Sequence, residues 1–561
     1  MKIPHQDHKR LDFYREIVDV CLASRARRME QYAQWRNYFF FGTSGSESPS
    51  PWNLLYAHLD TVSAFLYASD STRFSVRMGS KAQKSDRRRT SAFAKRIMEE
   101  WGGSNADLIY EMGVLWALIY DTTIIKHIRR GGTVLPFMID PACFGVYRED
   151  VPMLDRQEAF VHVYYMTKTD LEKRIALHPN KADILKAAVD SFAKKDIPSG
   201  TPPLIDRVVL TSGMPGVGSS PNITGEANVT LSSIPDYTAQ LDVPVIEMQE
   251  LYVWNDAEDD YQVCTLASES VVVFDRPNIF LPRSRDFEGE HGFVQICPNP
   301  LPDYFWGQSE CSKLAPVQDK LNARMEDIEN LEGKQVDPPG AWGGMGIAED
   351  KMAGFNIRGT QLAIDDPNFK HVTFEPNIPE HIYQSIDRFQ AHMDVISGLP
   401  NVVQGKGEAG VRSAGHAGKL LTVGSARPKK RALIIEKSLE LGATLFGKCL
   451  YVDEDEELYD EDDKPFIPAQ MSSHFFVDVD AHSNSPVFME NNRDLAAMLL
   501  QSRSITRERF IQMLKPPMEE ELLRDMKEKI VPGEQAAARA QMEAEAAKNA
   551  GAGKTPLKSV G

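Results

Sequence analysis

The chain has 561 residues, of which 42% are hydrophobic and 25% charged, and its formal net charge is −17. This length corresponds to about three or four compact units, and it is sufficient for an ordinary core without disulfides or metal. A protein that grips DNA tightly is usually basic, so the acidic balance argues against a high-affinity DNA binder. It remains compatible with a surface past which DNA slides.

The cysteines lie far apart along the chain and form no CxxC pair: Cys21, Cys143, Cys264, Cys297, Cys311 and Cys449. This spacing argues against a zinc site and against a disulfide scaffold, and it favours synthesis in a reducing cytosol. The polar opening Met1–Arg10 does not match a signal peptide. Since no apolar run approaches the roughly 18 residues of a membrane helix, we expect no membrane partner.

The first third of the chain is predicted to be helical, because apolar residues recur there every three or four positions. The predicted helices are Asp12–Arg36, Asn53–Ala68, Ser91–Trp101 and Asp107–Tyr120. An aromatic run, Tyr38–Phe41, follows the first helix and is typical of core packing.

The middle of the chain is rich in β-branched and aromatic residues, which predicts strands. The predicted strands are Thr123–Ile128, Val134–Ile139, Phe160–Met166, Val245–Trp254, Tyr261–Leu266 and Val271–Phe274. The last three are expected to form a meander. Between the third and fourth strands, Thr211–Pro235 is rich in Ser, Gly and Pro and predicts a long loop.

Two long amphipathic helices are predicted next. The first, Ser309–Leu331, would span about 35 Å at ~1.5 Å per residue. Gly333 is expected to stop it, and the run Asp337–Gly340 to prevent a restart. The second helix is predicted at Pro379–Ser397 and ends before Gly398. Two strand candidates lie between the helices: Gly354–Gly359 and His371–Phe374.

Residues Asn401–Gly418 are rich in glycine and predict a mobile loop. A third long helix is predicted from there to about Leu450, with a kink at Pro428. The remaining predicted elements are a strand at Phe475–Val479, helices at Asn492–Gln501, Thr506–Leu514 and Met518–Ile530, and a frayed, disordered tail at Pro532–Gly561.

This order of long helix, small β insert, long helix, loop and long helix resembles the portal (head-to-tail connector) proteins of tailed bacteriophages. The matching segments are Phe305–Ser309 with Leu314–Asn322 (start of the stem), His381–Pro400 (second stem helix and exit into the tunnel loop), Gly410–Gly415 leading into Leu420 and Leu421 (start of the tunnel helix), and Asn53–Phe74 (early wing helix). The resemblance covers residues 10–515 and rests on the order and spacing of elements.

The resemblance implies an α+β, portal-type fold with a wing, a two-helix stem, a small β clip, a long tunnel helix and a helical crown. Laid onto this chain, the parts are the wing (1–306), stem helix 1 (307–332), clip (333–377), stem helix 2 (378–398), tunnel loop (399–418), tunnel and wing helix (419–450), wing return (451–485), crown (486–531) and disordered tail (532–561). The clip is short and rich in Gly and Pro, which departs from the family.

The same resemblance implies a protein without enzymatic activity, cofactor or metal. Family members form rings of twelve around a channel at the capsid vertex, and they serve genome packaging, head–tail joining and DNA ejection. The implied partners are further copies of the chain, double-stranded DNA, the large terminase subunit, a head–tail adaptor, and scaffolding and major capsid proteins. The implied location is the virion, after assembly in the host cytoplasm.

Positive charge is concentrated around the predicted tunnel loop. Between Asn401 and Lys448 there are nine basic and three acidic side chains, within a chain that is acidic as a whole. Such a basic island suits transient contact with phosphate. The residues predicted to face DNA are Gln404, Lys406, Arg412, His416 and Lys419. The alternative is a solvated loop whose charges pair with a neighbouring subunit.

The polar faces of the two stem helices are acidic. The residues predicted to line the channel are Glu326, Glu329, Glu380, Asp387 and Asp394. Acidic walls repel phosphate and discourage tight stops, which suits a conduit for DNA. The equally open alternative is an ordinary solvated helix face or salt bridges between subunits.

Other motifs in the sequence are interpreted as ordinary loops or surface without a binding function. Gly405–Gly410 matches GxGxxG but follows a helix rather than a strand, and Gly551–Thr555 ends like a P-loop but lacks the first glycine. The acidic run Asp453–Asp463 lacks the calcium-loop pattern and predicts a solvated hairpin loop. Arg87–Arg89 predicts an exposed surface.

Two rival functions differ from a portal in what they require. A packaging NTPase or nuclease would need a true Walker motif or an acidic metal triad, and the sequence contains neither. Another virion structural protein, such as a head–tail adaptor or minor capsid protein, would not need two helices around a β insert. Imaging of the purified protein distinguishes the three, because only a portal forms a ring with a hole of about DNA width.

Overall fold

The computed structural model of the chain has two compact units, Met1–Ala481 and His482–Gly561. The residues that it describes are 1–4, 7–44, 50–67, 72–79, 82–130, 133–192, 245–267, 271–278, 280–281, 287, 289–343, 361–364, 370, 372–373, 380–398, 426–453, 457–460, 464–479, 496–502, 504–507, 510–511, 522 and 526. The fold mixes helix and sheet, which is consistent with the predicted α+β class. Chain length alone suggested more than two units.

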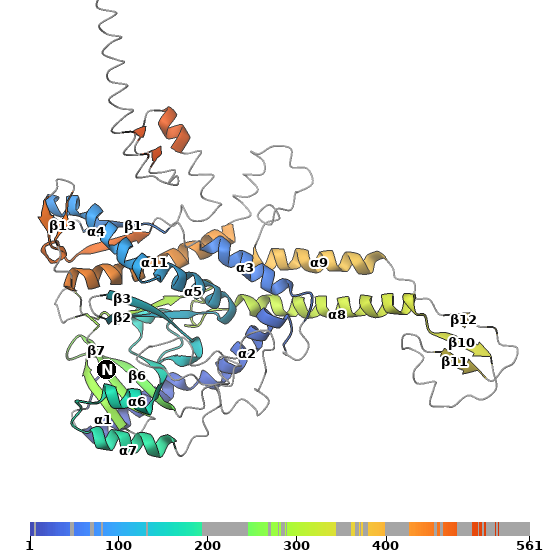
Figure 1. The fold of residues 1–561 in the computed structure, drawn as a ribbon, viewed down its shortest axis with the longest axis horizontal. Helices are drawn as coiled ribbons and strands as arrows, with labels where there is room; N and C mark the ends of the chain where they lie inside the picture. Colours follow the sequence, from blue (N-terminus) through green and yellow to red (C-terminus); the bar gives the residue numbers. More distant parts are fainter. Residues whose placement is uncertain are drawn as a thin grey trace, which may run out of the picture. The chain divides into compact units, whose positions relative to one another are not determined.

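The helices of the first unit alternate with its strands along the chain (Figure 1). They are α1 (Asp7–Leu22), α2 (Arg25–Phe41), α3 (Leu54–Leu66), α4 (Lys84–Gly103), α5 (Ala106–Tyr120), α6 (Lys168–Arg174), α7 (Lys181–Phe192), α8 (Glu310–Val336), α9 (Glu380–Ser397) and α11 (Ala426–Asp453), with 3-10 turns at Pro141–Cys143, Leu154–Arg156 and Pro468–Gln470. In the second unit, the described residues include a helical stretch at 496–501, within the predicted helix Asn492–Gln501.

In the described part of the chain, the strands form five small sheets. One has the order β4 (Phe144–Val146), β5 (Ala159–Thr167), β6 (Val245–Asn255), β7 (Asp260–Ala267) and β8 (Val271–Pro277), and a second has the order β3 (Thr133–Ile139), β2 (Thr123–Arg130) and β9 (Phe293–Ile296). The others are β1 (Phe74–Met78) with β15 (Phe475–Val479), β13 (Leu458–Tyr459) with β14 (Pro465–Phe466), and β11 (Gln361–Ile364), β10 (Gly340–Gly343) and β12 (Val372–Thr373) in that order. The predicted meander is confirmed, since β6, β7 and β8 pair antiparallel in sequence.

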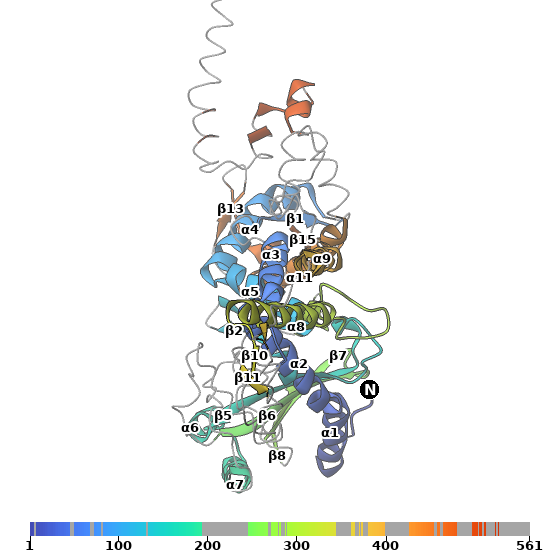
Figure 2. The ribbon, with the colours of Figure 1, turned by 90° about the vertical axis from the view of Figure 1, so that its right-hand side faces the viewer.

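The predicted single helix at Asp12–Arg36 is wrong, because the chain breaks at Ala23 and Ser24 into α1 and α2. The two halves pack in different places. Helix α1 lies against the five-stranded sheet at β4 and β5, whereas α2 packs against α5 and α8 (Figure 2). A straight helix could not bury both apolar faces, so the chain turns between them.

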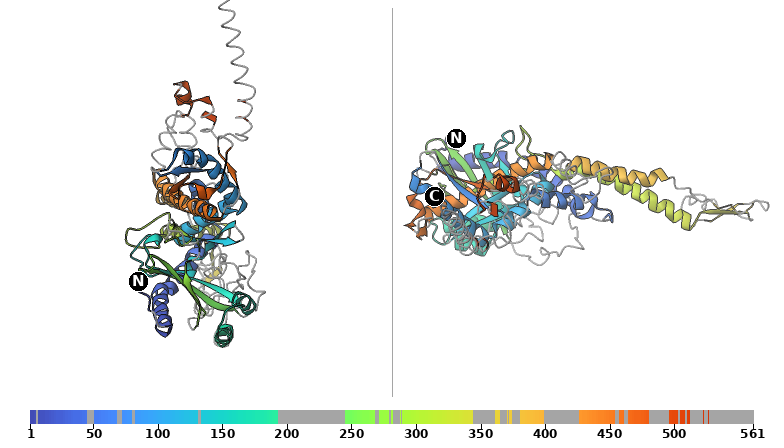
Figure 3. Two further views of the ribbon diagram at one scale, coloured as in Figure 1. Left: turned by 90° about the vertical axis from the view of Figure 1, so that its left-hand side faces the viewer. Right: turned by 90° about the horizontal axis from the view of Figure 1, so that it is seen from above.

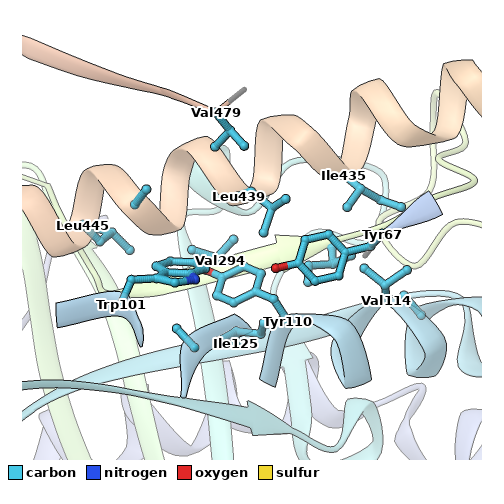
Figure 4. Packing of buried hydrophobic residues seen from close by; sticks show 14 of the residues in the cluster. Tyr67, Trp101, Tyr110, Val114, Ile125, Val294, Ile435, Leu439, Leu445 and Val479 are labelled. Carbon is cyan, nitrogen blue, oxygen red and sulfur yellow. The ribbon is translucent and has the colours of Figure 1, made fainter. Parts of the chain in front are cut away.

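The largest core joins residues from both ends of the first unit. Helix α11 lies across the aromatic side chains of α4 and α5, and Figure 4 shows Ile435 and Leu439 close to Tyr110. The contact is tight at Gly442, where a Cβ atom would collide with the Tyr110 hydroxyl. The Trp101 ring packs at a tilt against Tyr110 of α5 and Phe446 of α11, with ring centroids 4.8 and 5.0 Å away. Close packing of this kind fixes α11 on the body of the unit.

Two predictions about the long helices are wrong in detail. Gly333 does not end α8, which continues to Val336, and the Gly333 carbonyl accepts a hydrogen bond from Asp337 N–H at 3.0 Å. Pro338 and Pro339 then end the helix. Pro428 does not kink the described helix α11, because it is the third residue, where a backbone N–H would have no intrahelical acceptor in any case.

The strand candidate Gly354–Gly359, the loop Thr211–Pro235 and the tail Pro532–Gly561 lie outside the described residues. The candidate at His371–Phe374 is confirmed as β12. Helices Thr506–Leu514 and Met518–Ile530 lie mostly outside the described residues. Described elements that the sequence analysis did not predict are β1, β4, β9, β10, β11, β13, β14, α6 and α7.

Candidate functional site

Helices α8 and α9 form a hairpin that we call the stem hairpin, and the small sheet β10–β12 lies between them in sequence. The helices pack side by side (Figure 3). Near the sheet, the Tyr383 hydroxyl of α9 donates a hydrogen bond to Glu332 of α8 at 2.8 Å. Nearer the body, Ile328 of α8 and Met393 of α9 are buried. The predicted pair of amphipathic rods around a β module is therefore present in the first unit.

The start of α8 is held by its N-cap. The Ser309 hydroxyl accepts from Ser312 N–H at 3.4 Å, and it lies 2.5 Å from the Ile119 carbonyl at the end of α5. N-capping serines satisfy backbone donors that a helix leaves unpaired. The preceding Trp306 is buried beneath the Arg28 guanidinium, 3.7 Å from the ring centroid, so the junction into α8 is rigidly placed.

The first half of α8 is also bonded to the segment that joins α2 and α3. The buried Gln318 side chain donates to the Trp52 carbonyl at 2.8 Å and accepts from Leu55 N–H at 3.2 Å. Asn322 donates to the Gly42 carbonyl at 2.7 Å. These two residues belong to the segment on which the portal resemblance rests. They attach the stem hairpin to α3 and to the segment that follows α2 through backbone groups.

The acidic residues predicted to line the channel fall into three groups. Glu326 and Glu329 on α8 and Asp387 on α9 are exposed on the stem hairpin. Glu380 is the first residue of α9, and its side chain lies outside the described residues. Of the five predicted carboxylates, these three thus remain available to face solvent or a channel.

Asp394 corrects the prediction. Its side chain is 8% exposed and lies 3.3 Å from the imidazole Nε2 of His58 on α3. A carboxylate that is buried against another helix of the same chain cannot line a channel. The helical periodicity placed it on the polar face of α9, but that face turns into the body at this last turn.

The residues predicted to face DNA from the tunnel loop, Gln404, Lys406, Arg412, His416 and Lys419, lie outside the described residues. The described part of the basic island is on α11, and at least three of its members pair within the chain, among them Lys437 with Glu440. Arg431 is buried against Glu310, and Lys448 pairs with Glu290. Burial lowers the pKa of the Lys448 ammonium to about 8. The surplus positive charge that α11 offers to DNA is therefore smaller than the sequence predicts.

Two secondary motifs are placed as follows. Arg87 and Arg88 are exposed on α4, whereas Arg89 lies 3.7 Å from Asp86 and stacks over the Phe466 ring. Part of the acidic run Asp453–Asp463 forms the turn side of the β13–β14 hairpin, as predicted. The GxGxxG and P-loop-like strings lie outside the described residues.

Sequence reasoning missed the residues that join the helix ends, namely His58, Glu310 and Arg431. Glu310 and Arg431 are 121 positions apart, and their nitrogen and oxygen atoms approach within 3.1 Å. No local pattern links such distant charges. The one available signal was the N-cap residue Ser309, which marks Glu310 as the first residue of a helix.

Within the described part of the chain, no group of His, Cys, Asp and Glu side chains is arranged to hold a metal ion. None of the helices described there has the length and apolar character needed to cross a membrane. All six cysteines are buried free thiols. Neither a scan against models of protein families nor a search of curated proteins finds a match to this chain.

Proposed function

We propose that this chain is a portal protein, one subunit of a ring through which double-stranded DNA enters and leaves a phage head. The observation that carries the proposal is the stem hairpin, with α8 and α9 packed side by side around a small sheet. Long paired helices with one exposed acidic face are suited to repetition around a hole. The chain itself carries no motif for chemistry on DNA.

The electrostatics of the hairpin support a conduit rather than a binding site. Glu326, Glu329 and Asp387 are exposed, and charges act over a Debye length of about 8 Å at physiological salt. Phosphates that pass such a surface are repelled from every side. DNA would then move along the hole without a preferred resting position.

The sheet β10–β12 would supply the docking surface for the packaging motor and later for the tail. Its strands mix parallel and antiparallel pairing, and both edge strands, β11 and β12, leave one side unpaired within the described sheet. Unpaired strand edges readily accept another chain. The implied partners are the large terminase subunit and a head–tail adaptor.

The test is electron microscopy of the purified full-length chain, combined with mass measurement of the same sample. We expect rings with a central hole wide enough for a DNA duplex and a mass of about twelve 62.9 kDa chains. A monomeric globule, or a compact oligomer without a hole, would contradict the proposal and favour an adaptor or minor capsid protein. ATP hydrolysis by the purified chain would favour a packaging NTPase instead.

A further inference from the structure

Three helix ends meet at one buried arginine. Arg431, in the second turn of α11, donates through Nη2 to the Glu310 carboxylate at 3.1 Å and through Nη1 to the Ser397 carbonyl at 3.3 Å. Glu310 is the first residue of α8, and Ser397 is the last residue of α9. We call these three residues the stem clamp. It joins both helices of the stem hairpin to α11.

Charge and burial both favour this arrangement. The Glu310 carboxylate lies at the positive end of the α8 dipole, and the Arg431 guanidinium lies at the negative end of the α9 dipole. Glu310 is fully buried, and the Arg431 side chain is 9% exposed. Glu310 also accepts from Lys313 at 3.1 Å and from Asn299 at 3.2 Å, so its oxygens are satisfied. A buried pair with such partners holds one geometry.

The last turn of α9 has a second attachment on another side. Asp394 pairs with His58 of α3, and the neighbouring residue Met393 is fully buried in the core. The earlier part of α9 is held by α8, where the Tyr383 hydroxyl donates to Glu332 at 2.8 Å, and its Asp387 and Arg388 are exposed. The direction of α9 is therefore fixed at its end, where the clamp lies.

We propose that Arg431 is a positioning residue that sets the direction of the stem hairpin relative to α11. We also propose that a mechanical force on the sheet β10–β12 passes along α9 and through Arg431 into the wing. This second part depends on the proposed portal function, because it assumes that a motor acts on that sheet. The first part concerns the chain alone.

The ion pair can be removed without leaving a buried charge. Replacing a buried ion pair by apolar residues of similar size is often neutral for stability, whereas removing one partner is strongly destabilising. The double variant R431M/E310M therefore separates positioning from stability. The matched control is K437M/E440M, which removes an ion pair on the surface of α11 that links no other element.

The experiment measures a distance between spin labels in the full-length chain. Labels at V336C, near the end of α8, and L441C, on the outer face of α11, report the hairpin direction, and both positions are exposed. The six native cysteines are buried, so an unmutated sample measures background labelling. Labelled chains are diluted with unlabelled ones, so that distances within one subunit dominate.

We expect one narrow distance distribution in the parent and in K437M/E440M, and a clearly broader or shifted one in R431M/E310M with an unchanged melting temperature. An unchanged distribution in R431M/E310M would overturn the proposal. If that variant does not fold, R431K is measured instead. A lysine ammonium keeps the positive charge but cannot reproduce the planar pair of hydrogen bonds that the guanidinium makes. Broadening in R431K supports the proposal, and an unchanged distribution contradicts it.

The proposed transmission of force through Arg431 is tested separately, in a packaging reaction with assembled particles. Rings of R431M/E310M should form normally but package less DNA than K437M/E440M rings. Equal packaging would contradict the transmission of load. Should no ring form in the parent protein, the portal proposal fails, while the spin-label result still decides the positioning role of Arg431.

Discussion

The Asp394 carboxylate of α9 lies 3.3 Å from the imidazole Nε2 of His58 on α3, and both side chains are at least nine-tenths buried. This pair holds the final turn of α9 against α3. It also shows how a residue on the polar side of an amphipathic helix becomes internal when the helix meets the body.

We expect D394N to lower the free energy of unfolding by about 1–3 kcal/mol, because His58 loses a charged hydrogen-bond partner in a buried place. The matched control is D387N, an exposed change on the same helix, which should stay within about 0.5 kcal/mol of the parent. Denaturant titration measures both. Equal effects would mean that the His58 contact contributes nothing.

The exposed acids of the stem hairpin are expected to act on DNA passage and not on folding. In E326Q/E329Q/D387N, loss of repulsion should let phosphates rest on the wall, so DNA entry should slow, most clearly at low salt. The measurement is the amount of DNA packaged against time at two salt concentrations. The control E30Q/D183N/E258Q removes the same charge from exposed positions on α2, α7 and the β6–β7 turn. If both triple variants package alike, the acidic wall has no specific role.

Stability should depend on pH through His127. Burial removes the His127 ring from water and lowers its pKa to about 4, although the Gly292 carbonyl, 3.1 Å from Nδ1, acts in the opposite direction. The unfolded chain, with an ordinary histidine pKa near 6.5, binds that proton first. Stability is therefore full above about pH 6.5 and decreases as the pH falls towards 4, by up to about 3 kcal/mol.

Denaturant titrations at pH 7, 6, 5 and 4.5 test this expectation. In H127Q the loss of stability between pH 7 and 4.5 should be smaller than in the parent, whatever the effect of the substitution at pH 7. His162, whose pKa burial also lowers to about 4, supplies a second such slope and remains in the variant. Parallel curves for parent and variant would exclude His127 as a source of the pH dependence.

The close contact between α11 and α5 predicts a strong effect of a single methyl group. G442A should lower the free energy of unfolding by about 1–3 kcal/mol, because the new Cβ meets the Tyr110 hydroxyl. G102A on α4 meets no atom within 4 Å, so it should be neutral or slightly stabilising. Thermal unfolding measures both. In the background of Y110F, G442A should lower the free energy of unfolding by less. An equal loss in both backgrounds would mean that the Tyr110 hydroxyl is not the source of the strain.

Sequence reasoning located the elements whose periodicity is strong. Helix α3 begins after its N-cap Asn53 and α9 ends at Ser397, both close to the predicted limits. The strands β2, β5 and β6 were also predicted, because their segments are rich in β-branched and aromatic residues. Strand β1 was missed although β15 of equal length was predicted, because β1 has only two apolar β-forming residues, Phe74 and Val76, whereas β15 has four.

The candidate site was predictable only in outline. The hairpin and the exposed acids Glu326, Glu329 and Asp387 follow from local pattern. The contacts that position the hairpin do not, because Arg431 reaches Glu310 and Asp394 reaches His58 across more than one hundred positions of intervening chain. Such pairs form only when the tertiary fold brings two helix ends together, and no spacing along the sequence encodes that meeting.

The pairing of β1 with β15 has a consequence for biosynthesis. Ser75 and Asp478 are partners in this ladder, although 403 positions separate them. A ribosome that adds about 5–20 residues per second needs roughly 20–80 s to deliver the second strand after the first. During that interval the nascent chain exposes one apolar face of β1 and the uncovered aromatic residues of α4, so newly made subunits should depend on chaperone protection until translation passes residue 479.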